Sequence, residues 1–163
     1  MTAAMTMMTA PGGPVAGELP FFVYGTLLPG EPNHDLFLRG RTAGERPAVL
    51  PRALLYDGPG YPYAIDGHGR VHGTLLVAAP GVYGELLGLL DHLEEFLGPG
   101  HPRNLYERVV REVELPGQGA SEAGEPARAW VYLAAAAVTR SLRTGGVLIP
   151  GGRWTTGRAV DGP

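Results

Sequence analysis

The sequence predicts one domain of mixed α+β class, with an antiparallel sheet carrying most of the core. Three observations lead to this expectation. Short runs of strand-forming residues recur along the chain, separated by turns rich in Gly, Pro and Asp. One segment has a helical pattern instead, and 163 residues with 44% hydrophobic content suit one domain with its own core. The strands are compatible with an open sheet or with closure into a barrel.

The first elements follow from apolar patterning and turn residues. A buried strand is predicted over 19–26, because this segment is apolar and aromatic and contains Gly25 near its end. A turn is expected at 27–32. A short helix ending at Leu38 should follow, with the side chain of Asn33 capping its first N–H groups.

The remaining elements alternate with turns. A helix is predicted over 81–97, between Pro80 and a Gly-Pro-Gly stop. A polar loop at 118–126 should join two strands as a hairpin, and 151–154 should form a final turn anchored by one aromatic residue. Strands are expected at 41–49, 52–56, 61–65, 71–77, 106–115 and 127–133, with turns at 57–60 and 66–69.

The chain ends are expected to lie outside the fold. Residues 1–18 are predicted to be a disordered leader and 156–163 a tail, which leaves 19–155 as the domain. The leader has no basic segment and contains Pro and Gly, so it does not resemble a signal peptide. No apolar stretch approaches the ~20 residues that span a bilayer. A cytoplasmic protein is the expectation.

Composition excludes several kinds of chemistry and partner. The formal net charge is −3, and the 13 basic residues are all Arg without any basic run. Nucleic acid and anionic membranes are therefore not expected partners. The absence of Cys removes thiolate nucleophiles, disulfides and thiolate metal sites.

The helical segment carries a carboxylate on its apolar side. At about 100° per residue, Glu94 falls about 40° from Leu90, whereas Glu95 faces solvent and Asp91 lies at the margin. A core-facing carboxylate is costly to ionise without a partner, and burial raises its pKa toward the range useful to a general acid/base. The apolar stripe around Leu90 comprises Tyr83, Leu86, Leu87, Leu93 and Leu97.

The pattern leaves a second interpretation open. In this interpretation, the Glu94 side chain lies at the edge of the apolar stripe, turns outward and pairs with an arginine such as Arg103 or Arg108.

The segment Tyr24-Gly-Thr-Leu27 is a candidate anion site. A glycine directly after a buried strand allows a sharp turn, so that the N–H groups of Gly25, Thr26 and Leu27 can converge on an anion or a developing oxyanion. An ordinary turn that ends a strand is the alternative.

Other catalytic patterns are missing from the sequence. His68 and His72 are four apart but straddle a turn and a strand start, and there is no HExxH motif. Neither Ser121 nor Ser141 lies in a G-x-S-x-G elbow, and no P-loop is present. Neither a metal nor a cofactor is expected.

Several motifs in one order give the chain a family resemblance. It resembles the gamma-glutamylcyclotransferase superfamily, in its AIG2-like, gamma-glutamylamine cyclotransferase branch. The similarity covers about residues 20–133, and 149–154 resembles the ending of the branch. The motifs are Phe22-Val-Tyr-Gly-Thr-Leu27, Gly30-Glu-Pro-Asn-His34, Val71-His-Gly-Thr-Leu75, Leu90-Asp-His-Leu-Glu94, Leu105-Tyr-Glu-Arg108 and Trp130-Val-Tyr132.

The resemblance implies a fold, a reaction and a site. The fold is a small, mostly antiparallel β-barrel flanked by helices. The reaction cyclises the gamma-glutamyl group of a small gamma-glutamyl amine to 5-oxoproline and releases the amine, without metal or cofactor. Glu94 matches the catalytic carboxylate, residues 24–27 (Tyr24, Gly25, Thr26 and Leu27) match the loop that holds the glutamyl group, and Tyr106 matches a tyrosine beside the site. A catalytically silent barrel that binds a small ligand or a partner is the alternative.

One departure bears on the substrate. Relatives often have Gly after the catalytic Glu, whereas Glu95 and Phe96 follow here, and the loop at 97–104 is long and rich in Gly and Pro. That loop borders the expected side of the leaving group. The sequence therefore does not identify the released amine, and it gives no oligomeric state.

Overall fold

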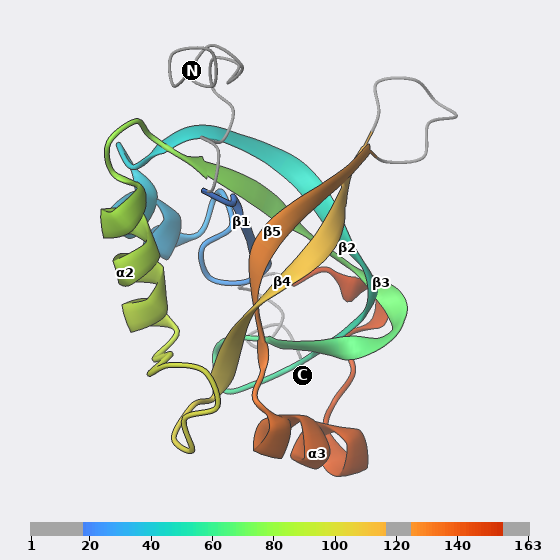
Figure 1. Ribbon diagram of the computed structural model, residues 1–163. Coiled ribbons are helices and arrows are strands. Elements are labelled where there is room, and N and C mark those ends of the chain that lie inside the picture. Colours follow the sequence, from blue (N-terminus) through green and yellow to red (C-terminus); the bar gives the residue numbers. More distant parts are fainter. Residues whose placement is uncertain (1–17, 117–124, 155–163) are drawn as a thin grey trace, which may run out of the picture.

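The computed structural model describes residues 18–116 and 125–154 (Figure 1). The expected leader, most of the expected 118–126 loop and the tail lie outside this part. Within the described residues no helix is both long enough and apolar enough to cross a membrane.

Five strands close into a barrel in the order β1-β3-β2-β4-β5. All neighbours are antiparallel except β1 and β5, which pair in parallel and close the ring. The small, mostly antiparallel barrel expected from the resemblance is therefore confirmed. The strands are β1 (Phe21–Val23), β2 (Thr42–Tyr56), β3 (Tyr63–Ala78), β4 (Tyr106–Leu115) and β5 (Glu125–Ala134).

Two pairs of predicted strands are single long strands. The segments 41–49 and 52–56 form β2, and 61–65 and 71–77 form β3. Pairing jumps from Pro51 with Arg70 to Ala53 with Asp66, so the predicted turn at 66–69 is a bulge inside β3 and not a chain reversal. The predicted turn at 57–60 does connect β2 to β3, which pair from Tyr56 and Tyr63 onward.

The helices differ from expectation in two places. A one-turn π-helix, η1 (His34–Leu38), occurs where a short helix was predicted, but Asn33 makes no side-chain capping hydrogen bond. The helix α3 (Ala136–Gly145) was not predicted, and none of its residues is fully buried. Its apolar contacts come mainly from Val138 and Leu142, which is too short a stripe to stand out in the sequence.

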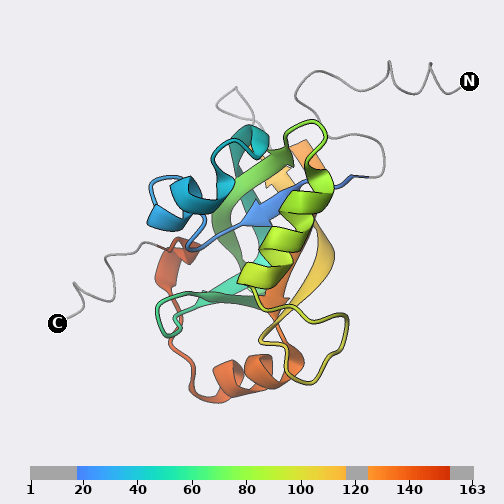
Figure 2. The same cartoon turned by 90° about the vertical axis from the view of Figure 1, so that its left-hand side faces the viewer.

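The core has two parts because β1 alternates its side chains between two faces. Phe22 and Tyr24 point into the barrel, whereas Phe21 and Val23 point outward. The helix α2 (Tyr83–Leu93) lies along the outside of the barrel beside β1 (Figure 2). Its residues Leu86 and Leu90 are fully buried in the outer core.

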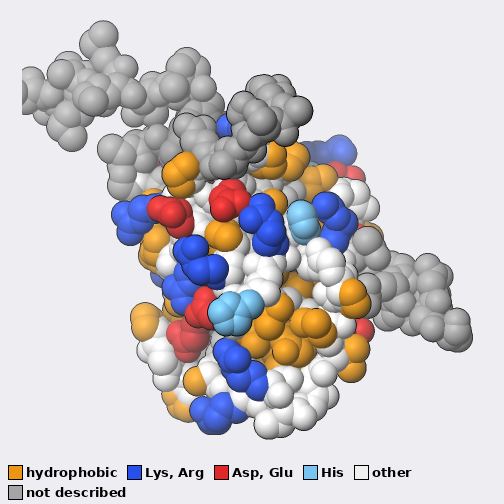
Figure 3. Space-filling view, turned by 90° about the vertical axis from the view of Figure 1, so that its right-hand side faces the viewer, with side chains coloured by type: hydrophobic (Ala, Val, Ile, Leu, Met, Phe, Trp, Pro, Cys, Tyr) orange, Lys and Arg blue, Asp and Glu red, His pale blue; other side chains and the backbone are white. Residues whose placement is uncertain are grey.

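The expected final turn is present as the short 3₁₀ helix η2 (Pro150–Gly152), and Trp154 is buried in the barrel interior as its aromatic anchor. The molecular face seen from the right of Figure 1 mixes hydrophobic, acidic and basic side chains (Figure 3). The site residues lie elsewhere, where the end of β1 meets the end of α2.

Candidate active site

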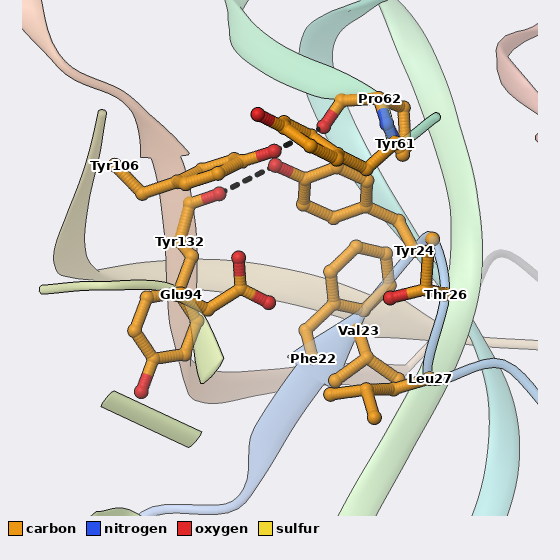
Figure 4. A pocket seen from close by; sticks show the side chains of 11 residues that line it. Phe22, Val23, Tyr24, Thr26, Leu27, Tyr61, Pro62, Glu94, Tyr106 and Tyr132 are labelled. Carbon is orange, nitrogen blue, oxygen red and sulfur yellow. Dashed lines mark hydrogen bonds between the residues drawn. The ribbon is translucent and has the colours of Figure 1, made fainter. Parts of the chain in front are cut away.

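One pocket, which we call the Glu94 pocket, is lined by all the residues predicted for the site: Tyr24, Gly25, Thr26, Leu27, Glu94 and Tyr106. Figure 4 shows Glu94 entering from one side, with Phe22, Tyr24 and Thr26 on the other. The pocket is lined by Phe22, Val23, Tyr24, Gly25, Thr26, Leu27, Tyr61, Pro62, Glu94, Tyr106 and Tyr132.

The loop after β1 is held close to the β2–β3 connection. A Cβ atom on Gly25 would lie 2.8 Å from Cδ of Pro62, which explains why glycine is needed there. The N–H of Leu28 donates to the carbonyl of Gly25 over 3.0 Å and closes a tight turn. The close approach of backbone expected from the sequence is thus present.

The same turn leaves backbone donors without acceptors. The N–H groups of Gly25, Thr26 and Leu27 make no hydrogen bond to any described residue. Leu27 is almost fully buried, whereas Gly25 and Thr26 are partly exposed. Successive backbone N–H groups in a turn of this kind form a concave anion site.

Glu94 lies at the end of α2, not within it. The helix was predicted to continue to Leu97 but ends at Leu93, and Leu97, placed in the apolar stripe, is 54% exposed. The N–H of Glu94 still donates to the carbonyl of Leu90 over 2.9 Å, so Glu94 continues the last turn. The next residue, Glu95, has a left-handed backbone with φ of +55°, which turns the chain away.

The Glu94 carboxylate has no hydrogen-bonding or ion-pair partner among the described residues. The outward pairing with Arg103 or Arg108 is not what the structure shows, because Arg108 pairs with Asp91. Glu94 is half-buried among aromatic and aliphatic side chains. Burial raises the pKa of the Glu94 carboxyl from its ordinary 4.5 to about 7.

The tyrosine hydroxyls at the pocket are bound to the main chain. The hydroxyl of Tyr24 donates to the carbonyl of Tyr132 over 2.5 Å and accepts the N–H of Ala64 over 3.2 Å. The hydroxyl of Tyr106 donates to the carbonyl of Pro62 over 2.6 Å. Burial raises the pKa of both hydroxyls, so they stay protonated at neutral pH. Tyr24 and Tyr106 therefore shape the pocket and are poor proton carriers.

A second carboxylate on the same helix has the opposite environment. Asp91 accepts a hydrogen bond from the Tyr132 hydroxyl over 2.5 Å. It also forms an ion pair with Arg108, with an N–O distance of 2.9 Å. The guanidinium also lies 4.7 Å from the ring centre of Trp130. This network joins α2 to β4 and β5 directly behind Glu94.

Sequence reasoning did not identify the network of Asp91 with Arg108 and Tyr132, and it missed several residues that line the Glu94 pocket. Tyr61, Pro62 and Tyr132 line the Glu94 pocket but were not site predictions. The Arg108 and Tyr132 positions stood in the quoted motifs, yet only the barrel brings them together with Asp91. Within residues 18–116 and 125–154 no three His, Cys, Asp or Glu side chains are grouped to hold a metal ion.

Comparison with known proteins places this chain in a family. The family model described as gamma-glutamyl cyclotransferase, AIG2-like, matches residues 21–156. The chain belongs to this family. The resemblance drawn from the sequence motifs is thereby confirmed.

Individual relatives of the AIG2-like family match part of the chain. The gamma-L-glutamyl-butirosin B gamma-glutamyl cyclotransferase of Niallia circulans is 36% identical over 112 residues, covering 69% of this chain and 64% of its own length. A protein of Vibrio cholerae is 38% identical over 74 residues, covering 45% of this chain and 60% of its own length. The chain thus spans less than two thirds of these curated relatives. The crystal structure of a mouse AIG2-like protein has the same fold, with a TM-score of 0.52 and 24% identity over 72% of this chain and 77% of that one.

Proposed function

We propose that the protein cyclises the gamma-glutamyl group of a gamma-glutamyl amine to 5-oxoproline and releases the free amine. One observation carries the proposal: a carboxylate whose pKa is raised to about 7 faces the N–H groups of Gly25, Thr26 and Leu27 across one pocket, and none of these groups is paired with a described residue. Membership of the AIG2-like gamma-glutamyl cyclotransferase family supports this class of reaction.

The reaction needs a proton carrier more than a nucleophile. The α-amine of the substrate attacks its own side-chain carbonyl carbon, a new C–N bond closes the five-membered ring, and the C–N bond to the leaving amine breaks. Because both reacting groups belong to one molecule, most of the entropy cost of bringing them together is already met. No water is consumed and no atom of the protein is transferred.

Glu94 is the group we assign to proton transfer. As carboxylate it takes a proton from the α-ammonium, and as carboxylic acid it returns one to the departing nitrogen. A pKa of about 7 suits both steps at neutral pH. The hydroxyls of Tyr24 and Tyr106 are held by main-chain carbonyls and that of Tyr132 by Asp91, whereas Glu94 is the carboxyl among the described residues that line the pocket.

The turn after β1 is assigned to the negative charges of the substrate. None of the described residues that line the Glu94 pocket is Lys, Arg or His, so we assign the binding of an anionic group there to N–H groups. The unpaired N–H groups of Gly25, Thr26 and Leu27 supply them for the glutamyl group and for the oxyanion of the tetrahedral intermediate. Each such donor contributes about 3 kcal/mol to lowering a barrier of this kind.

The test is release of 5-oxoproline, measured by mass spectrometry, from a panel of gamma-glutamyl amines. Wild type should release it, and Glu94→Gln, which keeps the side-chain shape, should be folded and lose activity by at least a hundredfold. Glu112→Gln is the matched control, since Glu112 is exposed on β4 away from the pocket. Normal turnover by Glu94→Gln would refute the assignment.

The competing function is a silent barrel that only binds a ligand. It predicts no 5-oxoproline from any amide, together with a rise in melting temperature on adding 5-oxoproline or glutamate.

A further inference from the structure

A second hollow opens outward from the Glu94 pocket. It shares five lining residues with that pocket, including Glu94 and Tyr106, so the two form one continuous space. We call the second hollow, without the Glu94 pocket, the outer hollow. Its further wall includes Leu93, Leu105 and Glu95. Because Glu94 lines both hollows, a substrate whose glutamyl group occupies the Glu94 pocket can extend its leaving amine into the outer hollow.

The charge of this space is negative. Among the described residues that line the two hollows, Glu94 and Glu95 carry carboxylates, and none is Lys, Arg or His. Arg103 lines a neighbouring hollow that Glu95 also lines, but no hydrogen bond or ion pair joins these two side chains, and Arg108 is paired with Asp91. Neither arginine lines the outer hollow.

Glu95 is held in place but its carboxylate is not engaged. Its N–H donates to the carbonyl of His92 over 3.1 Å, which fixes the backbone directly after Glu94. Its side chain is exposed and makes no hydrogen bond or ion pair with a described residue. The carboxylate is thus available to a charged group of a ligand.

We propose that the outer hollow binds the leaving amine and that Glu95 selects amines with a second positive charge. This inference rests on the proposed function. Leu93 and Leu105 offer apolar surface to a short carbon chain, and the Glu95 carboxylate meets an ammonium at its far end. A leaving group with a carboxylate in that position meets two negative charges and no positive one. The substrate class is therefore a gamma-glutamyl derivative of a diamine or polyamine, and peptides with a free carboxylate are disfavoured.

The experiment compares three amides of equal chain length. Gamma-glutamyl derivatives of 1,4-diaminobutane, pentylamine and 4-aminobutanoate present a cation, a methyl group and an anion at the same distance from the amide nitrogen. Wild type should have the highest kcat/KM for the first and the lowest for the third. Glu95→Gln should reduce the ratio of the first to the second by about threefold to fivefold, as expected for an exposed ion pair. Glu95→Lys should reverse the order of the first and third.

The matched control is again Glu112→Gln, which should leave these ratios unchanged. Added salt should reduce the wild-type preference, because exposed charges are screened within ~8 Å at 0.15 M ionic strength. A preference that survives Glu95→Gln, or a higher kcat/KM for the 4-aminobutanoate amide in wild type, overturns the inference.

A binding measurement separates this inference from the proposed function. Calorimetry of the three amides with Glu94→Gln, and with Glu94→Gln combined with Glu95→Gln, does not depend on turnover. If wild type releases no 5-oxoproline, the proposed function fails. Tighter binding of the diaminobutane amide that is lost in the double variant still supports selection by Glu95, and equal binding of all three amides refutes it.

Discussion

Glu94→Gln should make the protein more stable at neutral pH. In the folded protein the Glu94 carboxyl binds its proton more tightly than in the unfolded chain, because burial raises its pKa from 4.5 to about 7. Folding therefore becomes less favourable as pH rises and the carboxyl is forced to ionise in the pocket. Glutamine is neutral at every pH and removes this cost.

The magnitude follows from the size of the shift. Each pKa unit corresponds to about 1.4 kcal/mol, so the shift limits the cost to about 3 kcal/mol. Because the pKa is raised in the folded protein, the free energy of unfolding falls as pH rises. Below pH 4.5 both states hold the proton and the cost is absent, it grows between pH 4.5 and 7, and it is constant above.

The assay is urea denaturation of wild type and Glu94→Gln at half-unit steps from pH 4 to pH 8.5. The quantity compared is the difference in free energy of unfolding, in which the titration of all other groups cancels. Glu112→Gln should show no such pH-dependent difference. A difference between wild type and Glu94→Gln that stays flat across this range would show that Glu94 titrates normally, and the reasoning would be refuted.

Three further predictions concern the pocket. Wild-type kcat/KM should rise tenfold per pH unit on the acid side and bend near the Glu94 pKa of about 7, as measured from initial rates of 5-oxoproline release. Gly25→Ala places a Cβ 2.8 Å from Cδ of Pro62, so it should cost about 1–3 kcal/mol in urea denaturation and lower kcat/KM; unchanged values would mean that the loop is free to move. Tyr132→Phe removes the hydrogen bond to Asp91 and should cost about 1.5 kcal/mol of stability, which an unfolding midpoint equal to wild type would contradict.

The sequence predicts which segments form strands, but it does not predict that two neighbouring segments belong to one long strand. The sequence predicts a separate strand over 52–56, but this segment continues β2 beyond Pro51, where Arg52 has a left-handed backbone with φ of +55°. The structure keeps the strand intact, since β3 bulges opposite the same point and pairing resumes at Ala53. Such matched irregularities depend on two segments far apart in sequence and cannot be read from either alone.

The end of α2 shows a related limit. The sequence after Leu93 continues with good helix formers, and no glycine marks the C-terminus before Gly98. The helix nevertheless ends because Glu95 takes the left-handed conformation that a glycine usually provides. The predicted angular position of Glu94 still holds, because Glu94 directly follows Leu93 and its N–H donates to the carbonyl of Leu90.

The electrostatics of the site depend on partners that periodicity does not reveal. Asp91 lies at the margin of the predicted stripe and Glu94 inside it, and that pattern alone does not say which would find a cation. In the structure β4 and β5 bring Arg108 and Tyr132 to Asp91, whereas Glu94 receives neither.

This division of partners is what makes a proton carrier at Glu94 possible. If Arg108 faced Glu94, its positive charge would lower the carboxyl pKa and leave a weak base at neutral pH. With Arg108 held by Asp91 and placed over Trp130, the cation stabilises the end of α2 without entering the pocket. Two carboxylates one helical turn apart thus have different surroundings: Asp91 is paired at the helix end, and Glu94 has a pKa of about 7 at the position where the proposed reaction requires a proton carrier.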